Sequence, residues 1–354
     1  MRSLRTNKTL RTNVITYAVV VAAFVLFQAL GSAGVLSSTM KGQLVPICAY
    51  VLMALSLNLT VGILGELSLG HAGFMSIGAF AGAVTASAMQ DSVPSSALRL
   101  TVAVLVGAVL AAIVGVLIGI PVLRLNGDYL AIVTLAFGEI IKSIVNNLYI
   151  GMDVNGLHAS FLNNTIVLGE GGRMILSGPM GVPGIKKTAT FAAGFILILI
   201  ALFVIFNLVN SRAGRAIMAL RDNRIAAESV GINVTKYKLM AFVISAAIAG
   251  AGGALYGQAQ NAIIATKFDF NTSILILVFV VLGGMGNMLG SILAAALLTV
   301  LPELLRSLND YRMLIYAIVL ILMMLFNSAP AMIQWREQMT EKLREKFGKE
   351  KKEG

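Results

Sequence analysis

Few side chains in this chain of 354 residues could carry out chemistry. It has two histidines, His71 and His158, and a single cysteine, Cys48. A metal site needs about three or four ligands, and a Cys–His nucleophile needs a matched base. Two histidines and one cysteine are too few to support either. We therefore predict no catalytic residue, no metal-binding residue and no cofactor bound by the chain itself. Cys48 lies in an apolar stretch, can form no intrachain disulfide and is expected to serve in packing.

Two opposite charges, Glu139 and Lys142, interrupt an apolar segment that runs from Asp128 to Ile150. On a helix, residues three positions apart share one face. Charges persist in an apolar medium when they pair with each other or when they face a water-filled path. The spacing therefore leaves open a structural ion pair and a place in a translocation pathway. A transporter driven by an ion gradient would need several unpaired carboxylates, and this sequence has chiefly Glu139.

His71 and Glu66 flank a segment in which glycine recurs at 65, 70, 73 and 78. The histidine could contact a substrate, titrate, or hydrogen-bond a neighbouring backbone carbonyl. The glycines allow an unwound backbone that meets the charged groups of a small zwitterion, or close packing between helices. Both interpretations of the segment stay open at this point.

The composition requires an apolar environment for most of the chain. Hydrophobic residues make up 58% and charged residues 12%, which is too few charges for the surface of a soluble protein. Eight charge-free stretches of 23 to 33 residues follow one another, and about 20 apolar residues suffice for a helix to cross a bilayer. We predict an all-α polytopic membrane protein with about ten transmembrane segments, and a single permease domain over 1–354.

The net charge of +11 is explained by orientation rather than by binding to nucleic acid. Lys and Arg gather in the N-terminal residues, in 211–238 and in the tail 335–354, and cytoplasmic segments are enriched in both. Both termini are therefore expected in the cytoplasm, with 151–187 as an extracytoplasmic loop built of turns. The first span is expected at 14–36, a cleaved signal peptide being the alternative. The tail resembles an amphipathic surface helix or a solvated helix end.

The number of crossings must be even if both termini lie in the cytoplasm, and this condition constrains the last apolar stretches. Seven spans from the N-terminus end outside, so the stretch 270–302 must cross twice, broken at 283–287, or re-enter. Ten segments, or eight to nine with a re-entrant loop, satisfy this condition. The glycine-punctuated segments 69–78 and 282–290 are weakly similar and predict two related halves with interrupted helices, close packing by small residues being the alternative.

Three motif regions carry a resemblance to a known family. They are Gly65–Phe80, with the core G-E-L-S-L-G-H-A-G-F; Gly127–Ile140, with G-D-Y-L-A-I-V-T-L-A-F-G-E-I; and Ser211–Leu255, which starts S-R-A-G-R-A and ends A-G-A-G-G-A-L. Over about residues 40–330 the chain resembles the permease subunits of branched-chain amino acid ABC importers, specifically the LivM-like branch. The turn 177–182 also looks like the loop that precedes the sixth span in this family.

The resemblance implies a set of partners in a bacterial cytoplasmic membrane. They are a second, related permease subunit that forms a heterodimer with the chain, two cytoplasmic ATP-binding subunits and an extracytoplasmic substrate-binding protein. This sequence has no G-x-x-x-x-G-K-[ST] phosphate loop, so ATP-Mg is expected to be hydrolysed by the partners. The chain is accordingly expected to be no enzyme and to translocate Leu, Ile and Val.

The basic segment 211–238 is the expected ATPase-coupling element. A helix over Gly214–Val230 would use Ile217, Leu220, Ala227 and Val230 as apolar contacts and would stop at Gly231. The family pattern Glu-Ala-Ala-x-x-x-Gly is kept in spacing, with Ile225 in place of the glutamate. A loop held on lipid headgroups is the alternative. The coupling residues are predicted to be Gly214, Arg215, Leu220, Arg221, Asp222, Ala226, Ala227 and Gly231.

A translocation pathway is also predicted. Its candidate members are Ser68, Gly70, His71, Phe74, Thr134 and Glu139. Most recognition is expected to reside in the binding protein, so the permease need not have a tight substrate site. Urea or short amides, and ribose or nucleosides, are alternative substrates within the same machinery. A secondary transporter driven by an ion gradient is the alternative of another class.

Overall fold

The computed structural model describes residues 2–328 except for gaps at 35–36, 91, 126, 154–155, 163–165, 167, 170–171 and 306–310. The chain divides into two units, Met1–Leu297 and Leu298–Gly354, and most elements lie in the first. The second unit contains the end of α11 (Met288–Leu304) and α12 (Arg312–Ser328). The tail 335–354, predicted to be amphipathic, lies outside the described residues.

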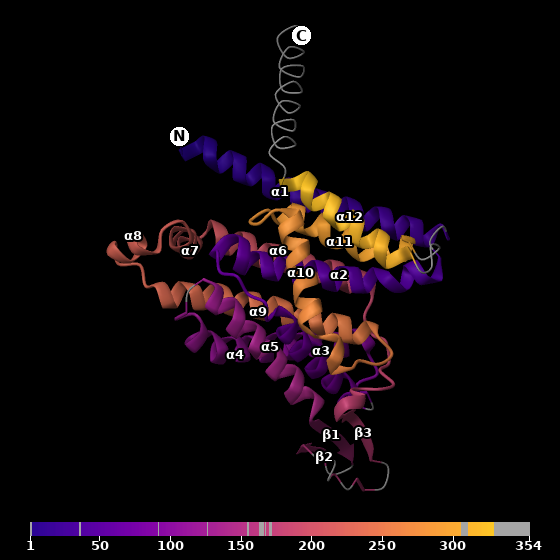
Figure 1. Cartoon of the computed structure of the whole chain (residues 1–354). Coiled ribbons are helices and arrows are strands. Elements are labelled where there is room, and N and C mark those ends of the chain that lie inside the picture. Colours follow the sequence, from indigo (N-terminus) through magenta and orange to yellow (C-terminus); the bar gives the residue numbers. More distant parts are fainter. Residues whose placement is uncertain are drawn as a thin grey trace. The chain divides into compact units, whose positions relative to one another are not determined.

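Helices make up most of the first unit (Figure 1). They are α1 (Arg2–Ser32), α2 (Ser38–Asn58), α3 (His71–Ala88), α4 (Ser96–Val122), α5 (Asp128–Asn146), α6 (Phe191–Asn210), α7 (Arg212–Asp222), α8 (Arg224–Ser229), α9 (Val234–Ala259) and α10 (Phe270–Gly283). Two 3-10 turns, Gly178–Met180 and Ala265–Lys267, and the π-helical turn η1 (Leu59–Leu64) accompany them.

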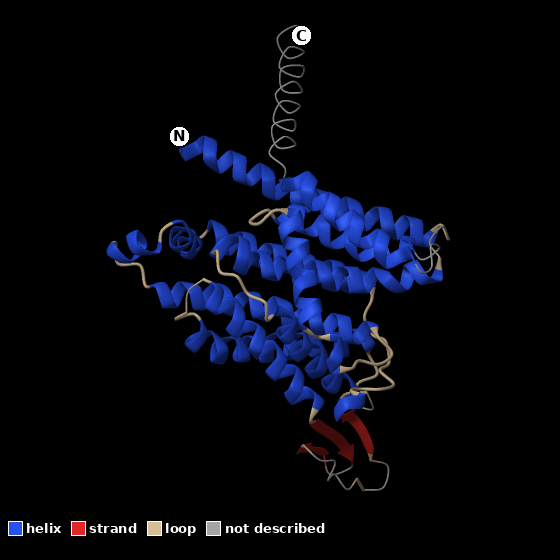
Figure 2. Cartoon of the chain, in the orientation of Figure 1, coloured by secondary structure: helices blue, strands red, loops and turns tan. Residues whose placement is uncertain are grey.

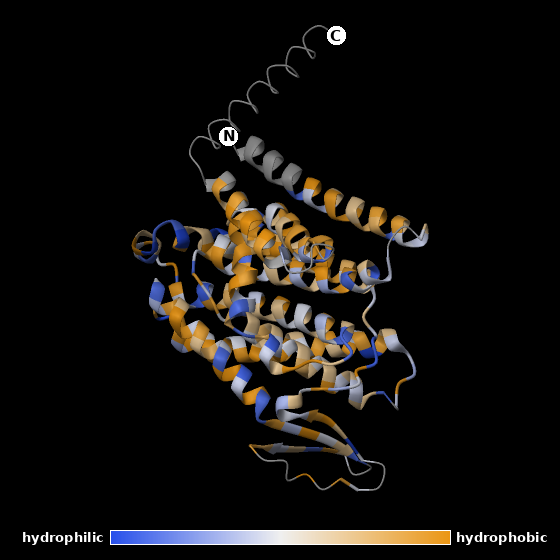
Figure 3. Ribbon diagram, turned by 45° about the vertical axis from the view of Figure 1, so that its right-hand side comes forward, coloured by the Kyte–Doolittle hydropathy of each residue, from blue (hydrophilic) through white to orange (hydrophobic). Residues whose placement is uncertain are grey.

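Long apolar helices identify the chain as a multi-pass membrane protein. Among the described residues, six helical segments are long and apolar enough to cross a bilayer. They are 13–32, 38–64, 96–122, 191–210, 234–259 and 265–283. Apolar residues cover these helices along their length, whereas hydrophilic residues gather around α7 and α8 (Figure 3). The predicted polytopic helical architecture is therefore confirmed, while the predicted number of ten spans stays a prediction.

The segment 151–187 differs from its prediction, because it contributes to a small antiparallel sheet rather than forming only turns (Figure 2). The strands are β1 (Leu148–Asp153), β2 (Gly156–Phe161) and β3 (Arg173–Ser177), in the order β2-β1-β3. Ile150 pairs with Ala159 on one side and with Leu176 on the other. The glycines and asparagines of this segment predict a loop. The short apolar runs between them nevertheless form strands, because their backbone N–H and C=O groups pair with those of a neighbouring run. The fold is thus helical with one sheet rather than all-α.

Helix α9 lies at the centre of the first unit, with α2, α3 and α4 packed against it. Its stretch Ala249–Leu255 is built almost entirely of glycine and alanine. A β-carbon at Gly250 would collide with the backbone of Gly107 on α4, and one at Gly253 with the backbone of Met75 on α3. Small residues allow helices in an apolar medium to approach closely and to gain van der Waals contact. Close packing is therefore what glycine provides at these positions.

The chain leaves regular helix where α2 ends. The π-helical turn η1 stops at Gly65, whose φ of 82° is a left-handed conformation that glycine adopts without strain. Residues 65–70 then continue without helical structure until α3 begins at His71. Single π-helical turns often mark functional sites, since the extra residue disturbs the regular hydrogen bonding.

Gly65 and Gly70 thus lie in unwound backbone. Gly73 and Gly78 instead lie within α3, where a β-carbon at Gly78 would collide with the Gly250 carbonyl group. Unwinding is therefore present at the first two glycines and close packing at the other two, and contact of this segment with a substrate stays a prediction.

The α7–α8 segment and the three-stranded sheet lie at two separate ends of the first unit (Figure 2). Helix α10 runs across the direction of α2 and α9 instead of alongside them (Figure 1). The chain then turns at 284–287, where Gly284 and Gly286 have φ values of 89° and 84°, before α11 begins.

Candidate functional site

A buried network of hydroxyl groups surrounds His71 at the start of α3. The imidazole Nε2 lies 2.8 Å from Ser245 Oγ on α9, and Nδ1 lies 3.2 Å from Ser68 Oγ on the unwound segment. All three side chains are buried. The structure thus brings together two of the predicted pathway residues, Ser68 and His71, with a serine that the sequence analysis did not single out.

Ser245 connects this network to α2. Its hydroxyl donates to the Ser56 carbonyl over 2.7 Å and accepts from Thr60 Oγ1 over 2.9 Å. Ser56 Oγ donates in return to the Ser245 carbonyl over 2.7 Å. A hydroxyl has one proton and two lone pairs, so the remaining lone pair of Ser245 accepts from His71 Nε2. His71 then carries its proton on Nε2, and Nδ1 accepts from Ser68.

Thr134 on α5 holds the unwound segment from the other side. The Leu69 N–H donates to Thr134 Oγ1 over 3.0 Å, and Thr134 Oγ1 donates to the Ala131 carbonyl over 2.9 Å. Gly70 lies so close to Thr134 that a β-carbon would collide with its carbonyl group. Two more predicted pathway residues therefore serve to anchor the segment.

The remaining two predicted pathway residues are Phe74 and Glu139, and neither forms a hydrogen bond with the network in the described part of the chain. Phe74 is buried in the core, where its ring meets His71 and Phe242 edge-on at centroid distances of 5.9 and 5.5 Å. Glu139 forms an ion pair with Lys142, and both are partly buried on α5. The structural ion pair predicted from their spacing is present, whereas a pathway role for Glu139 stays a prediction.

Asn58 joins the end of α2 to the turn between α10 and α11. Its Oδ1 accepts from the Gly286 N–H over 2.8 Å, and its Nδ2 donates to Ser291 Oγ over 3.0 Å. A β-carbon at Gly62 would collide with the backbone of Gly286. The two glycine-punctuated segments of the sequence thus both contain a helix break, and the turn at 284–287 lies against η1.

Helices α7 and α8 are two short helices where the sequence predicted one over Gly214–Val230. The break falls at Asn223, whose side chain accepts from the Ala226 N–H over 3.0 Å and caps α8. Ser211 caps α7 in the same way, over 3.1 Å to the Gly214 N–H. Gly231 ends the segment with a φ of 83°, as predicted.

The apolar contacts of this segment are partly as predicted. Ile217 is buried, and Leu220 and Ala227 pack with Val234 in a local cluster. Val230 was predicted to join them, but it is 75% exposed, and Ile225 is 80% exposed. The break at Asn223 rotates α8, so these two side chains face away from the cluster. They leave an apolar surface on α8 that no described residue covers.

Arg221 faces the membrane helices rather than pointing away from them. Its Nη1 donates to the Gly62 carbonyl of η1 over 3.0 Å, while Nε and Nη2 donate to Asp222 Oδ1 over 3.2 and 3.0 Å. Its aliphatic part lies against Gly65, where a β-carbon would collide with it. Among the predicted coupling residues, Arg221 therefore links α7 to the end of α2.

Glu66 and Lys238 form an ion pair between the unwound segment and the first turns of α9. The Lys238 side chain is 4% exposed and that of Glu66 is 14% exposed. A buried charge requires a partner, which is why the two residues are found together. The pairing was not predicted because the two residues are far apart in sequence and neither has a local partner.

The similarity of the chain to known proteins identifies its family. A family model described as the permease component of branched-chain amino acid transport systems matches residues 39–325, most of the chain. The chain belongs to this family.

Two curated relatives of this permease are the high-affinity branched-chain amino acid transport system permease proteins LivM of Salmonella typhimurium and Escherichia coli. Both are 37% identical to it, over 306 and 302 residues, which cover 82% of this permease and 69% of each relative. The nucleoside ABC transporter permease protein NupC of Lactococcus lactis is 26% identical over 207 residues, 55% of this chain and 59% of that protein. No solved structure matches the chain significantly.

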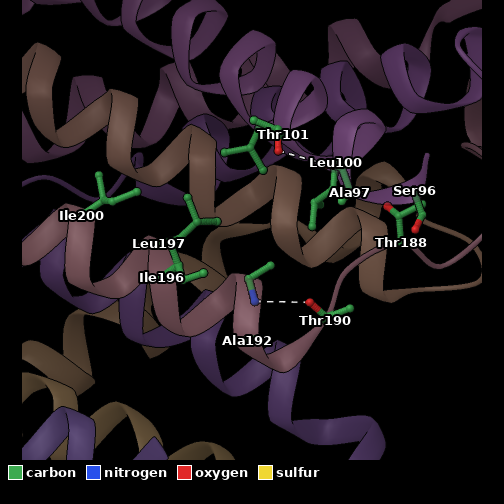
Figure 4. Close-up of a pocket in the computed structure, with 12 residues that line it drawn as sticks. Ser96, Ala97, Leu100, Thr101, Thr188, Thr190, Ala192, Ile196, Leu197 and Ile200 are labelled. Atoms are coloured by element: carbon green, nitrogen blue, oxygen red, sulfur yellow. Dashed lines mark hydrogen bonds between the residues drawn. The ribbon is translucent and has the colours of Figure 1, made fainter. Parts of the chain in front are cut away.

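A groove of about 390 Å³ lies between α4 and α6 of this permease (Figure 4). Leu100, Ile196, Leu197 and Ile200 supply apolar surface, and the hydroxyl groups of residues such as Thr190 lie at one end of it. It includes neither a charged residue nor a predicted pathway residue. Because a free amino acid carries two charges, this groove lacks the groups that would bind one.

Proposed function

We infer that this permease moves leucine, isoleucine and valine across a bacterial cytoplasmic membrane as a subunit of an ATP-driven importer. One observation carries the inference, the 37% identity to the LivM permeases over 82% of the chain. The helical multi-pass fold supports it, because the described residues provide six segments of spanning length. The absence of a phosphate-loop motif in the sequence means that hydrolysis of ATP-Mg must come from other subunits.

The α7–α8 segment is the proposed docking site for the ATP-binding subunits. Exposed Ile225 on α8 and Val230 at its end give an apolar surface, and the segment 211–238 that contains them has six basic residues. Buried apolar residues at the centre of an interface with charges around them are typical of specific protein contacts. The full assembly would contain two such ATPases, a second, related permease subunit and an extracytoplasmic binding protein.

The placement of charge supports one orientation. The α7–α8 end holds the basic segment 211–238, so it is proposed to face the cytoplasm, and the sheet to face outward. The sheet is then on the side from which a binding protein delivers the substrate.

The course of α10 favours a re-entrant segment over two further crossings. Its Ser273 accepts from the Ala72 N–H over 3.2 Å, and the following turn meets Asn58, so both ends lie near the buried network. Seven crossings by α1 to α6 and α9, one re-entrant pair α10–α11, and a last crossing by α12 would leave both termini in the cytoplasm. This corresponds to eight crossings instead of ten.

Passage of a substrate requires the buried network to separate. Ser68, His71 and Ser245 are proposed to line the path when α9 moves away from α2 and α3, exposing hydroxyl and imidazole groups to a zwitterion. Selectivity for one methylene contributes only about 1–3 kcal/mol, so discrimination among the three amino acids is assigned mainly to the binding protein.

Uptake into vesicles tests the proposal. The chain is co-expressed with candidate partner permease, ATPases and binding protein, and radiolabelled leucine is followed with and without ATP. ATP-dependent accumulation of leucine is expected, and accumulation without the ATPases would contradict the proposal. Uridine and urea are tested in parallel, because the resemblance to the nucleoside permease NupC covers 55% of the chain. Uptake of either without leucine would keep the mechanism and replace the substrate.

A further inference from the structure

Two polar contacts connect the α7–α8 end of the first unit to one short stretch of irregular backbone. The stretch comprises η1 and the unwound segment, residues 59–70. Arg221 contacts it from α7, and Lys238 contacts it from α9. Both contacts fall within five residues of one another on the stretch, at Gly62 and Glu66.

The Arg221 contact is made at the end of the π-helical turn. Gly62 lies in the last turn of η1, where backbone carbonyls lack a partner within the helix, so its carbonyl can accept from Arg221 over 3.0 Å. Gly65 has no β-carbon, so the stem of Arg221 can lie directly against the left-handed end of the turn. Asp222 holds the guanidinium group from the other side, which fixes its orientation.

The Lys238 contact holds the next part of the stretch. Lys238 is 3% exposed. It lies in the first turns of α9, the helix that follows the α7–α8 segment in the chain. Its ion pair holds Glu66, which comes two residues before Ser68 and five before His71 in the sequence. Any displacement of Glu66 is therefore passed to Ser68 through two peptide units that belong to no helix.

We propose that Arg221 and the Glu66–Lys238 pair are positioning residues that convert movement of the α7–α8 segment into opening of the Ser68–His71–Ser245 network. A helix transmits movement as a rigid body, whereas a few non-helical residues absorb large changes in backbone dihedrals. Residues 65–70 are the place where such a change can occur without breaking α2 or α3. Ser68 lies in these residues and His71 follows them directly. A shift of the Arg221 and Lys238 contacts therefore pulls Ser68 and His71 away from Ser245.

This inference rests on the proposed docking of the ATPases at α7–α8, and it predicts a specific failure. Without the two contacts, the ATPases would still bind and hydrolyse ATP, but the movement would not reach the network. The number of leucine molecules taken up per ATP hydrolysed is therefore the quantity to measure, in proteoliposomes that contain the full transporter. Arg221→Ala and Lys238→Met are each expected to lower this ratio at least about tenfold, within the range of measured coupling effects.

Matched variants separate coupling from folding. Lys236→Met removes an exposed lysine from the first turn of the same helix and should keep the wild-type ratio. Lys238→Met leaves Glu66 buried without its partner, so the charge-swapped double variant Glu66→Lys/Lys238→Glu is included as a rescue. Arg221→Lys, which can still donate one hydrogen bond to the Gly62 carbonyl, should restore part of the ratio.

The outcomes distinguish this inference from the proposed function. If the wild-type complex shows no ATP-driven uptake, the proposed function fails. If the wild type couples and the variants, co-purified with their ATPases, keep its ratio, the role of these three residues is wrong. Failure of the charge-swapped pair to recover the ratio from that of Lys238→Met would also overturn it.

Discussion

At the scale of single residues, Ser245 is the centre of the buried site. One hydroxyl contacts His71, Thr60 and both polar groups of Ser56, and these contacts join α2, α3 and α9. Without it, the His71 Nε2 donor and the Thr60 hydroxyl would each lose a buried hydrogen bond, and a buried donor left unsatisfied costs more than the hydrogen bond itself contributes. The network therefore stabilises the packing of α2, α3 and α9, and the proposed opening would expose its polar groups.

Replacing Ser245 with alanine should destabilise the purified permease by about 1–3 kcal/mol, the cost of unpaired buried polar groups. Thermal unfolding in detergent measures the change. Ser76→Ala is the matched control, because Ser76 is buried on α3 and its hydroxyl has no hydrogen-bond partner among the described residues. Equal losses in the two variants would show that the Ser245 hydrogen bonds do not contribute as described.

At the scale of elements, the α7–α8 segment has an inner and an outer side. Leu220 and Ala227 belong to a local cluster, whereas Ile225 and Val230 are exposed. The substitution Ala227→Asp, which sequence alone suggests as a test of docking, would place a charge inside the cluster and disturb the segment itself. Exposed α8 residues are the cleaner choice because they contribute little to folding.

Ile225→Asp should abolish co-purification of the ATPases with the permease while the melting temperature stays within a few degrees of the wild type. A carboxylate at the centre of an apolar interface is left unpaired and costs several kcal/mol of binding free energy. Affinity purification through a tag on the permease measures the bound ATPase. Met180→Asp, at an equally exposed residue near the sheet, should leave ATPase binding unchanged. Retention of the ATPases by Ile225→Asp would place the docking surface elsewhere.

At the scale of the whole molecule, the proposed orientation assigns the α7–α8 end and the sheet end of the first unit to opposite sides of the membrane. The family match covers 39–325, so both ends belong to the matched region. In this orientation the α7–α8 end is accessible only to a reagent on the cytoplasmic side, and the sheet end only to a reagent on the outer side.

Labelling of single cysteines tests this orientation. The single native cysteine, Cys48, is buried and is replaced first by alanine. Ala159→Cys, on an exposed position of β2, should react with an impermeant maleimide added to intact cells. Ser229→Cys, on exposed α8, should react only after the membrane is opened. The reverse pattern would invert the topology.

Much of this protein follows from local sequence. Charges that are costly in hydrocarbon bound the long apolar segments, and the spacing of Glu139 and Lys142 puts both on one helix face, where the structure has them paired. The strands at 148–177 were missed because edge pairing depends on segments that are only brought together by folding. The break at Asn223 was not predicted, because an asparagine side chain can either cap a new helix or lie within a continuous one, and the two arrangements differ little in free energy.

By itself, then, the sequence determined the helical membrane architecture, the break at 283–287 and the family. Only the tertiary structure decided that Ser245 meets His71, that Arg221 contacts Gly62, and that Lys238 pairs with Glu66. The pairs are separated by 174, 159 and 172 residues, so no local periodicity reports them. A buried polar group takes the partner that packing brings within reach, and that packing is set here by the small residues of α9.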